Sequence, residues 1–449
     1  MSSPNQLKRQ LGLRTATALV AGEVIGIGIF LTPAGMAKSL ASPFWLLIVW
    51  LVMGVMALCG ALCYGELAAR YPEAGGGYVY LREAYGKPIA FLYGWMTLVV
   101  MDPGLTAALA VGMAGYAGYI FKLSPIALKA LAIVTILLIG AVNILGVRVG
   151  AGILRGLTVL KLALLAFILI WGFGLRLGSW SNFTPFIAQH APATPLLPAL
   201  AGGMVAAFFS FGGWWDVTKL AGEVSNPVRT LPRALVYGVT VVMLVYILTS
   251  AVFFYLVPIN AVTSGETFAA QAGEILFGRI GGQILSAIVI VAVLGSLCAI
   301  IMSAPRVYFA MARDGLFVPA VAVIQPGFGT PARAITLQTL LASLLVILGN
   351  FNQIVSYFIF VVVIFIALTV TALFVLRRRP ANRIESVAPG FPITAILFLL
   401  LVGVLLFLLG SQDPRHALIG VGVVVLGIPV YYLLFGREQS EHKTRGDTS

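Results

Sequence analysis

Charged residues are scarce in this chain of 449 residues: they make up 10% of it, against about 25% in a typical soluble domain. Apolar residues account for 60%, and the mean hydropathy is +1.03. A disordered chain needs low hydrophobicity, and a water-soluble enzyme needs a charged surface. The composition therefore excludes both classes and indicates a membrane protein.

Cysteine and histidine are equally rare, with three of each. All three cysteines lie inside apolar runs, which excludes a small fold held by disulfides. The histidines lie in loops or in the tail, no His-Glu-x-x-His motif is present, and no Ser or Cys has a histidine base near it in the sequence. The sequence thus predicts no enzyme, no catalytic residue, no metal site and no cofactor. The cysteines are Cys59, Cys63 and Cys298.

Long apolar runs dominate the chain instead. About 20 apolar residues cross the hydrocarbon core of a bilayer as a helix, and the sequence holds about twelve such windows, of which the ninth is short. No connecting loop is long enough for a separate folded domain. The predicted spans are 14–39, 44–69, 88–120, 127–147, 152–176, 196–222, 233–257, 280–310, 333–349, 352–376, 391–410 and 416–435.

The basic residues predict the orientation. Lys and Arg exceed Asp and Glu by 28 to 15, a net charge of +13. Between the predicted spans, twenty of the basic residues fall on the side of the two termini and six on the other side. Cytoplasmic loops carry this excess, so both termini, including a tail at 437–449, are expected in the cytoplasm of a plasma (bacterial inner) membrane. Membrane topology explains the positive charge, and no nucleic-acid partner is expected.

Two spans carry glycine runs at mid-depth, Gly26–Phe30 in the first and Phe209–Gly213 in the sixth. Close packing of helices by small residues is one interpretation of each run alone. Unwound backbone that lines a cavity is the other. Spans 1–5 and 6–10 form equal blocks, and the glycine run falls in the first helix of each. Because five is odd, the second block enters from the opposite side, which is typical of an inverted repeat.

The predicted organisation is one transport domain with a first repeat at 13–177, a second at 196–378, and two further helices at 391–435. A binding site is expected where the two broken helices meet. Free N–H groups at the start of a half-helix suit a carboxylate, and free carbonyls at the end of one suit an ammonium group. A zwitterionic amino acid presents both charges.

Several motifs resemble one family in their order and spacing. The sequence is similar to the amino acid–polyamine–organocation transporter superfamily, and within it to the L-type amino acid transporters and their bacterial relatives. The resemblance covers nearly the whole chain. It is carried by Val24–Phe30 with Thr32 and Pro33, Gly60–Leu67, Gly75–Tyr78, Phe208–Trp214, Glu223–Pro227, Leu231 with Pro232, Arg306, and Ala312–Gly315.

The resemblance implies an all-α membrane fold of about twelve helices with a 5+5 inverted repeat, like the leucine transporter, and with helices 1 and 6 broken. It implies that N–H groups of the first break hold the substrate carboxylate, and that carbonyls of both breaks hold its ammonium group. It also implies that Phe209 closes over the site as a gate. The implied binding residues are Val24, Ile25, Gly26, Ile27, Gly28, Phe209, Ser210, Phe211 and Gly212.

The chain departs from the family pattern in four places. Ile27 replaces the usual serine, Trp215 stands where many members have asparagine, and Cys298 replaces an asparagine of span 8. These changes make the pocket less polar and bear on substrate choice. The loop 121–126 lacks the cysteine that links animal members to a heavy-chain glycoprotein, so no disulfide-linked partner subunit is expected.

We single out five ionisable residues of the predicted spans, because a charge at mid-bilayer costs roughly 2.5–3.5 kcal/mol and is a functional hypothesis by default. Lys161 matches a span-5 lysine of sodium-independent relatives and is the predicted coupling residue, unless it extends to the membrane edge. Asp102 either favours a cationic substrate or caps a kink at Pro103. Asp216 and Lys219 lie three residues apart and pair on one helix face. Glu23 meets either Lys161 or water.

The sequence therefore predicts a sodium-independent carrier that exchanges small to medium neutral L-amino acids by alternating access. Three alternatives stay open at this point. One is a proton-coupled symporter, in which Lys161 loses its proton during the cycle. The second is a permease for cationic amino acids or polyamines, and the third is an amino acid sensor that does not transport.

Overall fold

The computed structural model describes residues 7–187, 195–262, 265–348, 351–379, 388–412 and 414–446, and within these it is all helical. The α-helices are α1 (Leu13–Val24), α2 (Gly28–Leu40), α3 (Pro43–Arg70), α4 (Gly77–Tyr85), α5 (Lys87–Met96), α6 (Asp102–Phe121), α7 (Pro125–Ile144), α8 (Val147–Gly174), α9 (Leu196–Phe211), α10 (Pro227–Leu256), α11 (Gly265–Phe277), α12 (Gly281–Ser303), α13 (Pro305–Arg313), α14 (Ala332–Leu348), α15 (Phe351–Arg377), α16 (Ile393–Gln412) and α17 (Pro414–Gly446). Short turns of other helix types are η1 (Thr97–Met101), η2 (Trp180–Phe183), η3 (Asp216–Glu223), η4 (Ile259–Ala261), η5 (Gly278–Ile280) and η6 (Pro319–Ala322).

The predicted spans correspond to these helices. Over the described residues, ten helices are long and apolar enough to cross a membrane, and the bent pair of α1 and α2 makes an eleventh span. The short apolar helix α14 takes the place of the short ninth span. The all-helical membrane fold is thus confirmed. The last helix, α17, continues to Gly446 and includes most of the segment assigned to a tail.

Both predicted breaks are present. α1 ends at Val24 and α2 begins at Gly28, with a bend of 43° between them. α9 continues through Ser210 to Phe211, so the second break begins at Gly212, three residues after the start of the predicted run at Phe209. Gly213 has a φ of +101°, a backbone conformation that favours glycine, and the 3₁₀ helix η3 follows.

A third interruption lies next to Pro103, where a kink is one of the two interpretations of Asp102. The span that contains Asp102 consists of α5, the π-helical turn η1 and α6. Pro103 supplies no N–H, so the helix before it must rearrange its hydrogen bonds. Turns of this kind often mark functional sites, and this one places Asp102 at the start of α6 in the interior of the bundle.

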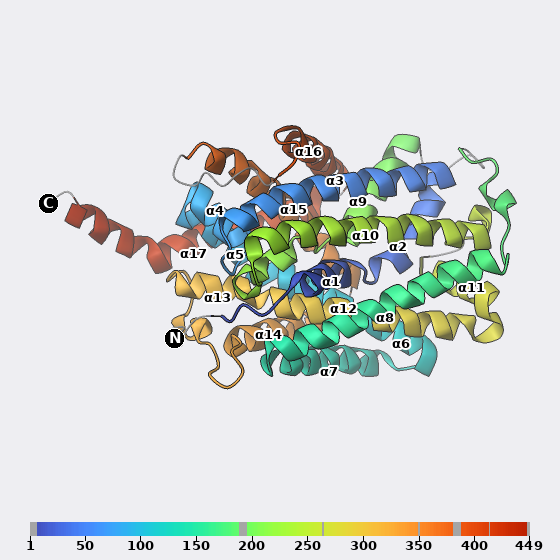
Figure 1. Cartoon of the computed structure of the whole chain (residues 1–449), viewed down its shortest axis with the longest axis horizontal. Coiled ribbons are helices and arrows are strands. Elements are labelled where there is room, and N and C mark those ends of the chain that lie inside the picture. The colour runs from blue at the N-terminus through green and yellow to red at the C-terminus, as the bar shows by residue number, and fades with distance from the viewer. Residues whose placement is uncertain are drawn as a thin grey trace.

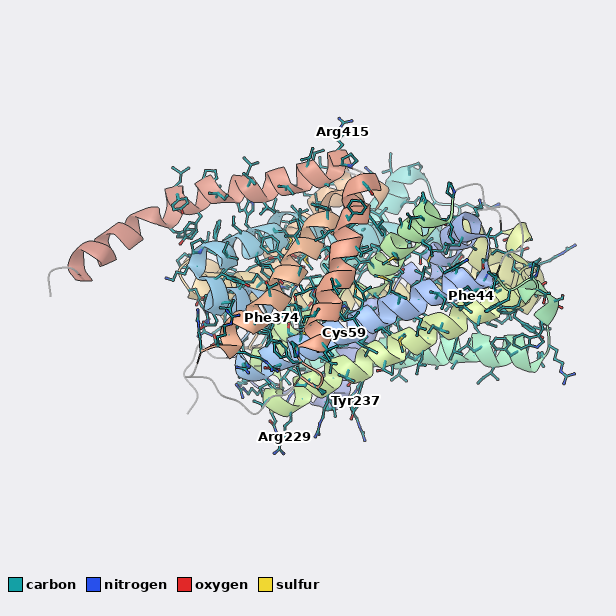
Figure 2. All side chains as sticks on the ribbon, turned by 90° about the horizontal axis from the view of Figure 1, so that it is seen from above. Phe44, Cys59, Arg229, Tyr237, Phe374 and Arg415 are labelled. Carbon is teal, nitrogen blue, oxygen red and sulfur yellow. The ribbon has the colours of Figure 1, made fainter. Side chains whose placement is uncertain are left out.

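The broken helices lie inside the bundle. α1 packs against α8, α10 and α12, and α2 packs against α9 and α11. Figure 1 shows α1 between α10 and α12, and it shows that α1 begins and α17 ends toward the same end of the molecule. α16 and α17 are the last two helices, and Figure 2 shows α17 along one edge of the molecule, with Arg415 near its start. Those two helices expose most of their surface, as lipid-facing helices do.

Candidate functional site

The two broken helices touch where α2 begins. A Cβ atom on Gly28 would lie 2.7 Å from Ser210 Oγ, 2.8 Å from Ser210 Cα and 2.9 Å from Ser210 Cβ. The hydroxyl groups of Thr32 and Ser210 are hydrogen-bonded at 2.9 Å. Only glycine allows this approach, because one of the opposing atoms belongs to the backbone of α9.

Gly28→Ala is therefore expected to destabilise the protein by about 1–3 kcal/mol, as overpacking does, and to weaken amino acid binding. The matched control is Gly35→Ala in the same helix, because a Cβ there meets nothing within 4 Å. That change should be neutral or stabilise by up to about 1 kcal/mol. Thermal unfolding and ligand binding in detergent test both variants. Equal behaviour of the two would remove the contact from the site.

Tyr246 of α10 joins the two breaks. Its hydroxyl lies 2.7 Å from the carbonyl oxygen of Val24 and 2.7 Å from that of Ser210. A phenol has one proton to donate, so it serves only one of the two carbonyls at a time. Tyr246 is not among the site residues predicted from the sequence. Its signal is a buried tyrosine in the middle of an apolar span, away from the membrane interfaces where such residues gather.

Lys161 of α8 is completely buried and reaches the first broken helix. Its ammonium group donates to the carbonyl oxygens of Gly22 at 2.8 Å and Ile25 at 2.6 Å, and to Ala292 of α12 at 2.6 Å. These three acceptors use all three of its donors. The alternative in which Lys161 extends to the membrane edge is therefore wrong. Its side-chain nitrogen instead joins the end of α1 to α12.

Lys219 of η3 lies between two acids. Its ammonium group is 2.9 and 3.1 Å from the two carboxylate oxygens of Asp102, and 3.0 Å from Asp216 Oδ2. All three side chains are buried. The predicted pairing of Asp216 with Lys219 is confirmed, and Asp102 joins it from α6. Both acids are thus already paired with a cation of the protein itself.

The predicted backbone groups lie together, and several bond one another. The N–H of Gly26 donates to the carbonyl of Val24 at 2.8 Å, and the N–H of Gly212 donates to that of Phe209 at 3.2 Å. Lys161 takes the carbonyl of Ile25. The first hydrogen bond of α2 is made by Phe30, to Ile27, so the amides of Ile27 and Gly28 are the open N–H groups expected at a helix start.

The side chains of the sixth span point to different places. Phe209 is half-buried, whereas Phe211 is buried against Trp50 and Tyr246. Trp215 stacks on Phe208 with ring centroids 6.4 Å apart. Its indole Nε1 is buried without a partner among the described residues. An unpaired buried donor is costly, so this N–H is a candidate contact for a substrate.

Cys298 does not join this group. Its thiol lies 3.6 Å from the carbonyl oxygen of Gly150 in α8 and 3.9 Å from Asn143 in α7. It therefore faces the helices behind the site. A direct contact between Cys298 and substrate would need a rearrangement of α12.

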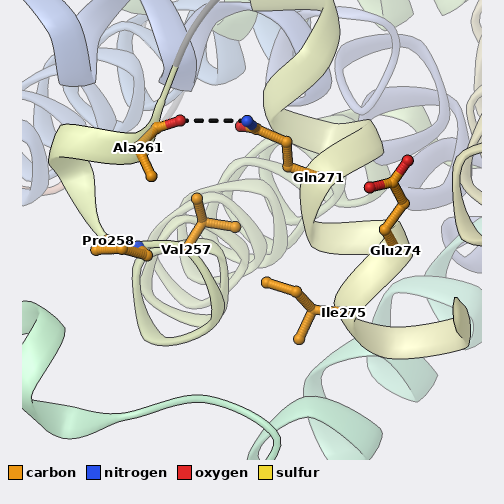
Figure 3. Close-up of a pocket in the computed structure, with 6 residues that line it drawn as sticks. All are labelled: Val257, Pro258, Ala261, Gln271, Glu274 and Ile275. Carbon is orange, nitrogen blue, oxygen red and sulfur yellow. Dashed lines mark hydrogen bonds between the residues drawn. The ribbon is translucent and has the colours of Figure 1, made fainter.

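One pocket lies elsewhere, at the end of the molecule where α11 lies. It has a volume of about 350 Å³ and is bridged by a hydrogen bond of 3.2 Å from Gln271 to the carbonyl of Ala261 (Figure 3). None of the predicted site residues lines it. The lining residues are Val257, Pro258, Ala261, Gln271, Glu274 and Ile275.

Within the described residues, no group of three His, Cys, Asp or Glu side chains is arranged to hold a metal ion.

The family model described as amino acid permease matches residues 11–433. The serine/threonine exchanger SteT of Bacillus subtilis is 31% identical over 442 residues, which cover 97% of this chain and 99% of that protein. The b(0,+)-type amino acid transporter 1 of Homo sapiens is 30% identical over 95% of this chain and 88% of its own length. The large neutral amino acids transporter small subunit 2 of Mus musculus is 29% identical, with shares of 95% and 81%.

Proposed function

Because the chain belongs to the amino acid permease family, we propose that it exchanges small to medium neutral L-amino acids across the plasma (bacterial inner) membrane, with both termini in the cytoplasm. The family consists of transporters, not enzymes. One observation carries the finer proposal: Lys161 binds three carbonyls at the first break and at α12. A fixed ammonium group there does the mechanical work that a bound sodium ion does in other carriers.

The substrate class follows from the charges around the site. The cationic alternative rests on Asp102 and Asp216, and both accept hydrogen bonds from Lys219. The amides of Ile27 and Gly28 and the indole N–H of Trp215 are donors for the substrate carboxylate. Apolar Ile27 and Trp215 leave little to bind a polar substrate side chain. The names of two relatives, a serine/threonine exchanger and a large neutral amino acids transporter, agree with a neutral substrate.

Uptake by the purified protein in liposomes tests the substrate class. Unlabelled alanine, valine and leucine should compete with a labelled neutral amino acid better than arginine or putrescine does. Stronger competition by arginine or putrescine would restore the cationic alternative. Binding of amino acids without any uptake would instead support a sensor.

An inverted repeat is proposed as the architecture of the transport domain. Residues 13–177 and 196–378 should superpose after inversion, so that α1 and α2 coincide with α9 and η3. The pairing of the two breaks supports this. No disulfide-linked partner subunit is proposed, since the loop 121–126 has no cysteine.

Phe209 is proposed as the gate. Phe209→Ala should lower the turnover of exchange more than it weakens substrate binding in detergent, because a gate acts by closing over bound substrate. The matched control is Phe211→Ala, which should instead destabilise the fold by about 3–5 kcal/mol, since this ring is buried in the core. Small and equal effects of Phe209→Ala on binding and turnover would return this residue to a packing role.

A further inference from the structure

Four ionisable side chains gather next to the two breaks: one precedes the first break in the sequence, and two follow the second break. Glu23 lies in the last turn of α1, Asp102 begins α6, and Asp216 and Lys219 belong to η3. Glu23 is 6% exposed, and the other three are at most 1% exposed. The cluster therefore holds three acids and one ammonium group, and it joins three segments of the bundle.

The ammonium group of Lys219 is fully used by two of the acids. It contacts both oxygens of Asp102 and one oxygen of Asp216, Oδ2. The second oxygen of Asp216, Oδ1, and Oε1 of Glu23 are both buried with no partner among the described residues. Two carboxyl groups are thus left with an unsatisfied oxygen each.

These two carboxyl groups lie next to each other. Glu23 packs against the second break: a Cβ on Gly213 would lie 3.0 Å from Glu23 Cγ and 3.3 Å from Glu23 Oε1. Asp216 follows three residues later and is hydrogen-bonded to Gly213 through the backbone at 3.0 Å. The Glu23 carboxyl group is close enough to that of Asp216 for two negative charges there to repel each other.

Among the described residues, Lys219 is the cation that forms ion pairs with this cluster. Lys161 of α8 is committed to three carbonyls. The other titratable groups near the cluster are neutral hydroxyls: Tyr64 of α3, Tyr93 of α5 and Tyr308 of α13. Tyr308 lies 2.6 Å from Gln338 Oε1, so its proton is already placed. Two ionised carboxylates cannot lie side by side in such an interior, and neighbouring acids in this position share a proton.

We propose that Glu23 and Asp216 form a proton-binding site, in which the two carboxyl groups share one proton in the conformation described here. One group carries an O–H bond and donates it to an oxygen of the other, which gives both unsatisfied oxygens a partner. With Asp102 ionised and Lys219 protonated, the shared proton changes the net charge of the whole cluster from −2 to −1. The shared proton joins the end of α1 to η3. These are the half of the first broken helix before its break and the half of the second broken helix after its break.

Loss of this proton to water leaves two negative charges where α1 meets η3. Their repulsion drives the two segments apart on the side of the membrane where both termini are proposed to lie. This is the side that opens in an inward-facing carrier. Rebinding of the proton closes it again. In an exchange cycle the proton leaves and returns on the same side, so no net proton movement accompanies substrate. This role in transport rests on the proposed function, whereas the presence of the proton does not.

Infrared spectroscopy of the purified full-length protein in lipid tests the proton directly. The wild type at neutral pH should show the C=O band of a protonated carboxyl group, shifted in D₂O. Glu23→Gln and Glu23→Met keep the side-chain length, and each should lose the band. If only one of the two variants folds, that variant is enough for the test. Glu274→Gln is the matched control: this carboxyl group is exposed on α11, and its removal should leave the band unchanged. A band that persists without Glu23, or that is missing from the wild type, would overturn the proposal.

The pH profile of exchange gives a second readout. Wild-type exchange should depend on the pH on the side of the membrane where both termini are proposed to lie. Glu23→Gln mimics the protonated state permanently, so its exchange should be slower and should not depend on that pH. An unchanged pH profile in Glu23→Gln would contradict the opening role. If the band behaves as expected and no transport is found in any variant, the proton site stands and the proposed exchange fails.

Discussion

Replacement of Lys161 by alanine is expected to slow amino acid exchange about 10- to 100-fold. The change leaves three buried carbonyl oxygens, those of Gly22, Ile25 and Ala292, without a donor. Each loss costs about 1–3 kcal/mol, and about 1.4 kcal/mol is a factor of ten in rate. The end of α1 then loses its attachment to α12. The open amides of Ile27 and Gly28 remain, so substrate binding should weaken far less than turnover.

A second variant separates charge from packing. Lys161→Met keeps the length of the side chain and should lose as much activity as Lys161→Ala. Lys38→Ala is the control, because Lys38 is an exposed lysine on α2, and it should leave exchange unchanged. Turnover is measured in liposomes and affinity in detergent. Full activity in Lys161→Met would show that the ammonium group is not needed.

The largest effect on stability is expected from Lys219→Met. This change leaves Asp102 and Asp216 buried without their cation, and the loss of one partner from a buried ion pair costs about 3–5 kcal/mol. The free energy of unfolding should fall by that amount in chemical unfolding of the protein in detergent micelles.

Replacement of the whole group provides the control. Asp102→Leu, Asp216→Leu and Lys219→Met together remove every unpaired charge of the triad, and buried ion pairs replaced by apolar residues are often neutral in stability. The combined variant should recover most of the lost stability. Glu73→Gln, which removes one acid from a half-exposed contact with Arg82, should change stability by less than about 1 kcal/mol. A harmless Lys219→Met would mean that the three charges do not form one group.

The sequence predicts the spans well, because twenty apolar residues in a row have one stable arrangement in a bilayer. It also predicts the first break closely, since glycine at mid-depth is a local signal. The second break begins later than expected because Ser210 and Phe211 still continue α9. The 3₁₀ geometry of η3 has no local signal of its own.

Contacts between distant segments are what the sequence could not supply. Asp216 and Lys219 are three residues apart, and periodicity alone pairs them. Asp102 is 117 residues from Lys219, and no local rule brings the two together. The same holds for Tyr246, which reaches Val24 over 222 residues. The position of Lys161 was predicted through a family resemblance, and its three carbonyl partners required the fold.

One measurement tests the central claim most directly. The purified protein is placed in liposomes, and uptake of a labelled neutral amino acid is compared between liposomes loaded with unlabelled amino acid and empty ones, without sodium and without a pH gradient. The account predicts strong stimulation by internal amino acid, no requirement for sodium, and little uptake into empty liposomes. Uptake that appears only when sodium is added, or uptake into empty liposomes when an inward proton gradient is added, would contradict it.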